Sequence, residues 1–100
     1  MRHVMVRYRV KPGRAEENEE LIRAVYAELQ REQPADMRYS THSLDDGRSF
    51  VHLHEGESAG LTGLPAFQEF QRGIQDRCEE PPVVTELTEV GSYRPAAEGA

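Results

Sequence analysis

The spacing of hydrophobic positions changes in a regular order along this chain. It is two residues, then about 3.6, then two in each of two successive segments, then about 3.6, then two again. This order predicts strand, helix, strand, strand, helix, strand. Two such halves with right-handed crossovers are typical of a ferredoxin-like α+β fold, with a four-stranded antiparallel sheet and both helices on one face.

Turn and capping signals place these elements along the chain. The first helix is expected between the Lys11-Pro12-Gly13 break and Pro34, and its glutamate-rich first turn suits the positive end of the helix dipole. Asp45-Asp46-Gly47 predicts the turn of a hairpin. The expected strands are 3–10, 37–44, 49–55 and 83–93, and the second helix is expected from Pro65 to Cys78, stopped by Pro81 and Pro82.

Composition limits the class of protein. One hundred residues with 37% hydrophobic content make a single domain, expected over residues 1–94, with a disordered tail at 95–100. The formal net charge of -6 repels phosphate backbones and anionic headgroups, so neither nucleic acid nor membrane is an expected partner. A single cysteine excludes an intrachain disulfide, and the apolar run of a signal peptide is missing, so a cytoplasmic protein is expected.

Alternation along the first and third strands predicts two different sheet faces. We expect the helices to cover an apolar face made by Val4, Val6, Tyr8, Val51 and Leu53. The opposite face would then carry aromatic, thioether, imidazole and guanidinium groups, from His3, Met5, Arg7, Arg9, Phe50, His52 and His54. Such a mixture is typical of a wet cavity between two sheets.

Three segments resemble the antibiotic biosynthesis monooxygenase-like group of the dimeric α+β barrel superfamily. They are the first strand and turn Val6 to Gly13 with the glutamate-rich helix start, Leu64-Pro65-Ala66-Phe67 at the second helix, and Val83 to Val90 near the end. The resemblance implies a homodimer in which two sheets face each other and enclose a pocket in each subunit. Some members of this group oxidise polyketide-like aromatic molecules without metal or flavin, some cleave haem, and many have no assigned role.

The chain departs from the catalytic sets of that group. Haem-cleaving members use a Trp, an Asn and a His, but this chain has no Trp, and its one Asn, Asn18, falls in the first helix. Haem cleavage is therefore disfavoured. Quinone-forming members use Trp and Asn beside Tyr and Arg, and only the last two types are available here, from Tyr39, Tyr93, Arg7, Arg9 and Arg38.

The residues that could carry chemistry are the histidines and arginines of the strands. His52 or His54 is the expected general base, and Arg7 the expected stabiliser of an anion through its fixed fork of donors. The histidines could instead be cavity or interface residues, or could bind a metal together with His3. The arginines could instead pair with glutamates of a second subunit.

These observations lead to one functional hypothesis and one alternative. The hypothesis is a cofactor-independent monooxygenase for a small planar aromatic or polyketide-like molecule, with no metal and no other cofactor. Catalysis is assigned to His52, His54 and Arg7, and substrate binding to His3, Met5, Arg9, Tyr39 and Phe50. The alternative is a non-catalytic dimeric domain that binds a small molecule or has a structural role. Cys78 is expected to pack on the apolar stripe of the second helix, and His42 to lie exposed at a sheet edge.

Overall fold

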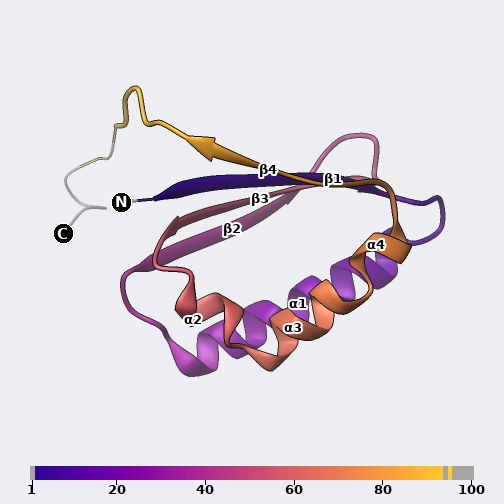
Figure 1. Cartoon of the computed structure of the whole chain (residues 1–100), viewed down its shortest axis with the longest axis horizontal. Coiled ribbons are helices and arrows are strands. Elements are labelled where there is room, and N and C mark those ends of the chain that lie inside the picture. Colours follow the sequence, from indigo (N-terminus) through magenta and orange to yellow (C-terminus); the bar gives the residue numbers. More distant parts are fainter. Residues whose placement is uncertain (1, 94, 96–100) are drawn as a thin grey trace.

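One antiparallel sheet of four strands forms one layer of the molecule, and the helices form the other (Figure 1). The computed structural model describes residues 2–93 and 95. The elements in chain order are β1 (His3–Val10), α1 (Ala15–Glu32), β2 (Met37–Ser43), β3 (Ser49–Gly56), α2 (Ala59–Thr62), α3 (Pro65–Arg72), α4 (Ile74–Arg77) and β4 (Cys78–Leu87). The strand order β2-β3-β1-β4 confirms the ferredoxin-like α+β prediction. All helices lie on the same side of the sheet in Figure 1.

The register between β1 and β3 decides which side chains the helices cover. Tyr8 lies opposite Phe50, and Val6 lies opposite His52, so these four side chains share the face beneath the helices. The face predicted for β1 is confirmed, but the face predicted for β3 is wrong. Phe50, His52 and His54 point toward the helices, while Val51 and Leu53 lie on the opposite face. The buried imidazole of His52 is tolerated there because both of its nitrogens have hydrogen-bond partners.

The second half of the chain differs from the sequence prediction in two places. The expected helix from Pro65 to Cys78 is divided at Gly73 into α3 and α4. Cys78 is buried as predicted, but it begins β4 rather than ending a helix. Residues 88–93, which were expected to extend the last strand, lie outside it.

Pro81 and Pro82 lie inside β4 instead of ending a helix before it. Two conditions make this possible: β4 is an edge strand, and its pairing with β1 shifts between Arg7 and Arg9. Proline has no N–H for a sheet ladder, so edges and bulges are where strands accept it.

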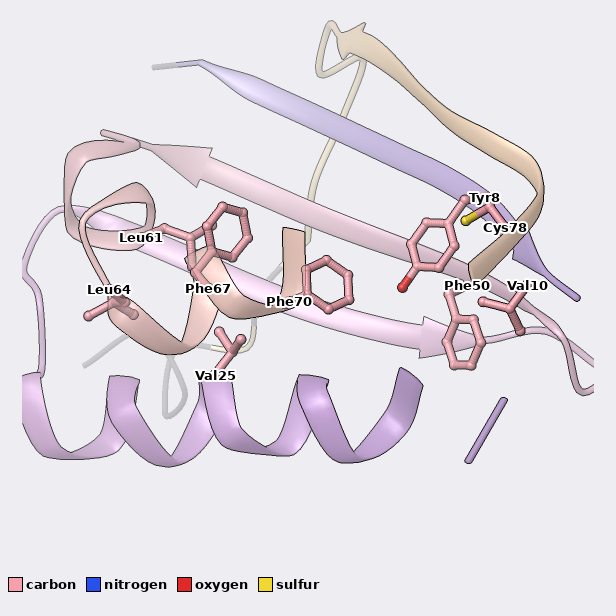
Figure 2. Packing of buried hydrophobic residues seen from close by; sticks show 9 residues of the cluster. All are labelled: Tyr8, Val10, Val25, Phe50, Leu61, Leu64, Phe67, Phe70 and Cys78. Atoms are coloured by element: carbon pink, nitrogen blue, oxygen red, sulfur yellow. The ribbon is translucent and has the colours of Figure 1, made fainter. Parts of the chain in front are cut away.

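The hydrophobic core lies between the sheet and helices α1 and α3. Tyr8 and Phe50 from the sheet are stacked with ring centroids 5.6 Å apart, and Phe70 of α3 packs against Tyr8 at 6.2 Å. Figure 2 shows Val25 of α1 below Phe67 and Phe70, with Leu61 and Leu64 on the α2–α3 side.

A carboxylate of α1 fixes the start of α3. Glu28 Oε1 accepts a hydrogen bond of 2.9 Å from the backbone N–H of Ala66, in the first turn of α3. The first N–H groups of a helix lack partners within the helix, and α3 has no side-chain cap at Leu64. The Glu28 side chain is only 14% exposed, so the contact is shielded from water.

No helix in the described part of the chain is long and apolar enough to cross a membrane. The expected tail lies almost wholly outside the described residues, since only residue 95 of it is described. Its disorder and the domain boundary at 94 therefore stay predictions.

Replacing Glu28 by Ala should lower the free energy of unfolding by about 1 kcal/mol, because the α3 N–H loses its partner. Urea unfolding at pH 7 measures this change. Glu20→Ala is the matched control, since Glu20 is an exposed glutamate on the same helix. Equal stability of the two variants would contradict the capping role.

Candidate functional site

A cavity of about 300 Å³ lies between the helix-covered face of the sheet and the α2–α3–α4 segment. Its walls are mainly apolar, with Val4, Val6, Leu61, Phe67, Phe70 and Ile74 among them. Four polar aromatic or imidazole side chains also line it: Tyr8, Tyr39, His52 and His54. Ligand pockets typically measure about 300–1,000 Å³, so this one would suit a small molecule of a few rings at most.

His52 lies at the centre of the polar wall and is hydrogen-bonded through both ring nitrogens. Its Nε2 lies 2.9 Å from Tyr8 Oη. Its Nδ1 lies 2.6 Å from Tyr39 Oη and 3.1 Å from Thr41 Oγ1. Thr41 Oγ1 in turn lies 2.8 Å from Tyr26 Oη of α1. The imidazole is therefore held in one orientation by groups from β1, β2 and α1.

The network continues from Tyr8 to a buried arginine. Asn18 Nδ2 donates to Tyr8 Oη at 2.8 Å, and Arg77 Nε donates to Asn18 Oδ1 at 3.1 Å. Arg77 is only 2% exposed. Its Nη2 donates to the carbonyl of Phe70 at 2.7 Å, and its guanidinium lies 5.2 Å from the centre of the Phe70 ring. A cation is thus buried against neutral dipoles and an aromatic face at the end of the network.

His54 differs from His52 in having a free acceptor or donor position. Among the residues that the structure describes, His54 Nε2 is a buried side-chain atom without a hydrogen-bond partner. The residue lines the cavity and packs edge-on against Tyr39, with centroids 6.1 Å apart. An unpartnered buried nitrogen costs stability unless something binds it.

Burial controls the ionisation of the cavity groups. It lowers the pKa of His52 from 6.5 to about 4, so this imidazole is neutral at pH 7. Burial also lowers the pKa of His54, with a backbone hydrogen bond to Glu57 acting in the opposite direction. The pKa values of Tyr8 and Tyr39 are raised, again chiefly by burial. All four side chains are consequently uncharged at neutral pH.

The structure divides the predicted site residues between the two sheet faces. His52, His54 and Tyr39 come together at the cavity, and Phe50 packs behind them against Tyr8. The residues expected beside them on β1, namely His3, Met5, Arg7 and Arg9, lie on the opposite face. The predicted single cluster is therefore wrong, because the β3 register is one residue away from the expected one.

The opposite face has two shallow hollows of its own. One of about 410 Å³ is lined by His3, Arg38 and Glu55 among others. The second, of about 420 Å³, is lined by Met5, Arg7 and Val83 among others. The alternative for the arginines was pairing with glutamates of a second subunit. Arg9 does form ion pairs with glutamates, but they are Glu79 and Glu80 of the same chain. His42 is exposed, as predicted.

Sequence reasoning missed Asn18 and Arg77, and treated Tyr8 only as a core residue. Asn18 had a detectable signal, because it extends the apolar stripe of Leu21, Val25 and Leu29 by one further helical step. A buried asparagine needs partners, which predicts a polar network next to it. Arg77 had the same kind of signal, since it extends the apolar stripe of Phe67, Phe70 and Ile74 by one further helical step.

Within residues 2–93 and 95, no three His, Cys, Asp or Glu side chains lie in an arrangement that could hold a metal ion.

Comparisons with known proteins concern the fold. No protein-family model and no curated protein sequence matches this chain. Among solved structures, one of an antibiotic biosynthesis monooxygenase is 20% identical, covers 91% of this chain and 100% of its own, and has a TM-score of 0.72. A candidate antibiotic biosynthesis monooxygenase from Nitrosomonas europaea is 22% identical, with the same coverages and a TM-score of 0.74.

A third structure is a mutant of SnoaB, a cofactor-independent oxygenase from Streptomyces nogalater. It is 17% identical, covers 91% of this chain and 94% of its own, and has a TM-score of 0.65. The chain has the antibiotic biosynthesis monooxygenase-like fold. In this example of that fold, a cavity lined by His52 and His54 lies between the sheet and the helices of one chain.

The low pKa of His52 predicts a pH dependence of stability. The unfolded imidazole takes up a proton below pH 6.5, whereas the folded one, with a pKa of about 4, does not. The free energy of unfolding should therefore fall by about 1.5 kcal/mol from this group between pH 6.5 and pH 5. Urea unfolding at both pH values should show a smaller fall in His52→Gln than in the wild type. His42→Gln, at an exposed position, should behave as the wild type, and equal pH dependence in all three proteins would refute a buried neutral His52.

Proposed function

We propose that this protein is a cofactor-independent monooxygenase acting on a small planar aromatic or polyketide-like molecule bound between the sheet and α3. The observation that carries the proposal is His54 Nε2, which has no hydrogen-bond partner among the described residues and belongs to a residue that lines a mainly apolar cavity. The likeness of fold to SnoaB, named a cofactor-independent oxygenase, supports the same class of reaction.

The proposed reaction needs a base and a dry chamber. His54 removes a proton from an activated CH₂ group flanked by aromatic rings or carbonyls, which leaves a carbanion delocalised onto a neighbouring oxygen. This electron-rich anion passes electrons to O₂, and a peroxide forms at the same carbon. Loss of water from the peroxide, with the second hydrogen of that carbon, gives a carbonyl, so that CH₂ + O₂ becomes C=O + H₂O. The substrate supplies every electron.

His54 suits the base better than His52. A base must have a free lone pair within reach of the substrate proton. Both nitrogens of His52 are occupied by Tyr8, Tyr39 and Thr41, whereas Nε2 of His54 is not occupied by any described residue. His52 accordingly positions its tyrosine neighbours. The rings of Phe67, Phe70 and Tyr39 around the cavity favour a flat substrate.

An anion-stabilising donor must come from the same cavity. Arg7 lies on the opposite sheet face, so it does not reach a molecule held beside His54 in the same protomer. Tyr39 and Ser58 line the cavity and their hydroxyl groups are neutral donors, whereas the Thr62 hydroxyl already donates to the Ser58 carbonyl. Arg7 keeps a role only if a ligand also binds on the open face.

Replacing His54 by Gln should reduce turnover at least 100-fold, because a glutamine amide cannot accept the substrate proton. Oxygen consumption with a panel of anthrones and hydroxynaphthalenes measures this loss. His42→Gln is the matched control and should keep wild-type turnover, since His42 is exposed on the other face.

The pH profile gives a second readout for the wild type. The base must be neutral, so kcat/KM should rise through a pKa below 6.5 and stay flat above it. Wild-type turnover in His54→Gln would exclude His54 as the base. Binding of panel members without oxygen consumption would instead favour the alternative of a non-catalytic small-molecule-binding domain.

We further propose that two copies associate through their open sheet faces. The face away from the helices carries Val51, Leu53, Val83 and Leu87, of which Val83 is 62% and Leu87 is 39% exposed. Exposed apolar groups on a sheet without a covering layer favour burial against another surface. The second copy would form the barrel and would also cover the hollows that contain His3, Met5 and Arg7.

The double substitution Leu53→Lys and Val83→Lys should convert a dimer to a monomer. Each copy would bring two lysine charges into the apolar contact, where they would be desolvated and would repel those of the other copy. Light scattering after gel filtration measures the mass. The matched control is Glu20→Lys on α1, on the far side of the molecule, which should leave the dimer intact. A monomeric wild type at 50–100 µM, roughly the concentration range of such measurements, would refute the association.

A further inference from the structure

We propose that Arg77, acting through Asn18 and Tyr8, holds His52 with its hydrogen on Nδ1, and that this leaves the Tyr39 hydroxyl as the donor that recognises a carbonyl or enolate oxygen in the cavity. The ligand part of this proposal rests on the function proposed above. The hydrogen-bond direction does not, because it follows from the contacts alone.

The direction begins at Arg77, whose guanidinium can only donate. The Asn18 atom that faces it at 3.1 Å must therefore be the amide oxygen, and the amide nitrogen must face Tyr8 at 2.8 Å. An inverted amide would place its N–H groups against the guanidinium of Arg77, donor against donor. The orientation of Asn18 is thus set by a group that cannot reverse its role.

The same reasoning passes from Tyr8 to His52. Tyr8 Oη accepts the Asn18 hydrogen, so its own hydrogen is available for His52 Nε2, at 2.9 Å. Among the described residues, His52 Nε2 is the hydrogen-bond acceptor available to the Tyr8 hydroxyl. His52 is neutral, so when Nε2 accepts, the single ring hydrogen must be on Nδ1.

On the far side of the ring, Nδ1–H donates to Tyr39 Oη at 2.6 Å, with Thr41 Oγ1 at 3.1 Å as a weaker second acceptor. The hydrogen of the Tyr39 hydroxyl then needs an acceptor of its own. Thr41 Oγ1, which His52 and Tyr26 also engage, can take this hydrogen when no ligand is bound. Tyr39 lines the cavity, so a ligand oxygen there can accept this hydrogen.

This arrangement has a chemical consequence for the ligand. A Tyr39 hydroxyl that accepts from His52 is a polarised donor, since each hydrogen bond in a chain strengthens the next. It favours ligands with a carbonyl, phenolate or enolate oxygen over hydrocarbons of the same shape. Tyr39 contacts the ligand, whereas Arg77, Asn18 and Tyr8 are positioning residues.

Replacing Asn18 by Asp should reverse the whole chain of hydrogen bonds. A carboxylate only accepts, so it would take a hydrogen from Arg77 and another from Tyr8. Tyr8 Oη would then accept from His52, whose hydrogen would move to Nε2, and Nδ1 would accept from Tyr39. The substitution preserves shape and gives the buried guanidinium a charged partner, so folding should be retained.

The test is the position of the His52 ring hydrogen in long-range ¹H–¹⁵N correlation spectra at pH 7, without any ligand. The wild type should carry it on Nδ1 and Asn18→Asp on Nε2, while Arg77→Lys, which keeps a cationic donor, should match the wild type. A wild-type hydrogen on Nε2 overturns the proposal, whatever the variants do. So does a folded Asn18→Asp protein with an unchanged ring.

Ligand recognition is tested separately with 1-tetralone, a two-ring ketone, and tetralin, the same skeleton without oxygen. Tyr39→Phe should weaken 1-tetralone binding about tenfold, as expected for one lost hydrogen bond, and leave tetralin binding unchanged. Asn18→Asp should show the same selective loss. Equal weakening of both probes, or no binding of 1-tetralone to the wild type, overturns the role of Tyr39. The NMR spectra do not depend on oxygen consumption. The proposed monooxygenase function can therefore fail without overturning the assigned position of the His52 ring hydrogen.

Discussion

The buried guanidinium of Arg77 is the constraint on which the polar interior depends. A cation removed from water is stable only when its hydrogens have acceptors, and here Asn18 and the Phe70 carbonyl supply two of them. Because Asn18 is committed to Arg77, it can offer only its amide nitrogen to Tyr8. One buried charge therefore orders side chains from α1, β1, β2 and β3 before any ligand arrives, and the cavity wall is preorganised rather than assembled on binding.

The division of labour between the two cavity histidines follows from this order. His52 and His54 are two residues apart on the same strand and face the same way, yet the network reaches only His52. His52 is held rigid and neutral, which suits a positioning role. His54 keeps an unpartnered nitrogen, which suits proton transfer. The two histidines thus differ in chemistry because the hydroxyl groups of Tyr8 and Tyr39 are hydrogen-bonded to His52.

Much of the fold could be predicted from the sequence, because hydrophobic period and turn residues report local structure directly. The strand order follows from the order of elements and right-handed crossovers, and the faces of β1 follow from Val4, Val6 and Tyr8 alternating with His3, Met5 and Arg7. The face of β3 could not be predicted in the same way. Hydrophobicity alone favours Val51 and Leu53 as the buried set, whereas the buried His52 is held by hydrogen bonds to Tyr8, Tyr39 and Thr41, residues distant in sequence. That single-residue difference in register is why the candidate site was expected on the wrong side of the sheet.

The two prolines of β4 have a consequence beyond the bulge that accommodates them. An outermost strand with a continuous row of N–H groups offers a template on which further strands can add, the first step toward fibrous aggregates. Pro81 and Pro82 interrupt that row in the middle of β4. Lateral growth of the sheet from this edge is thereby discouraged.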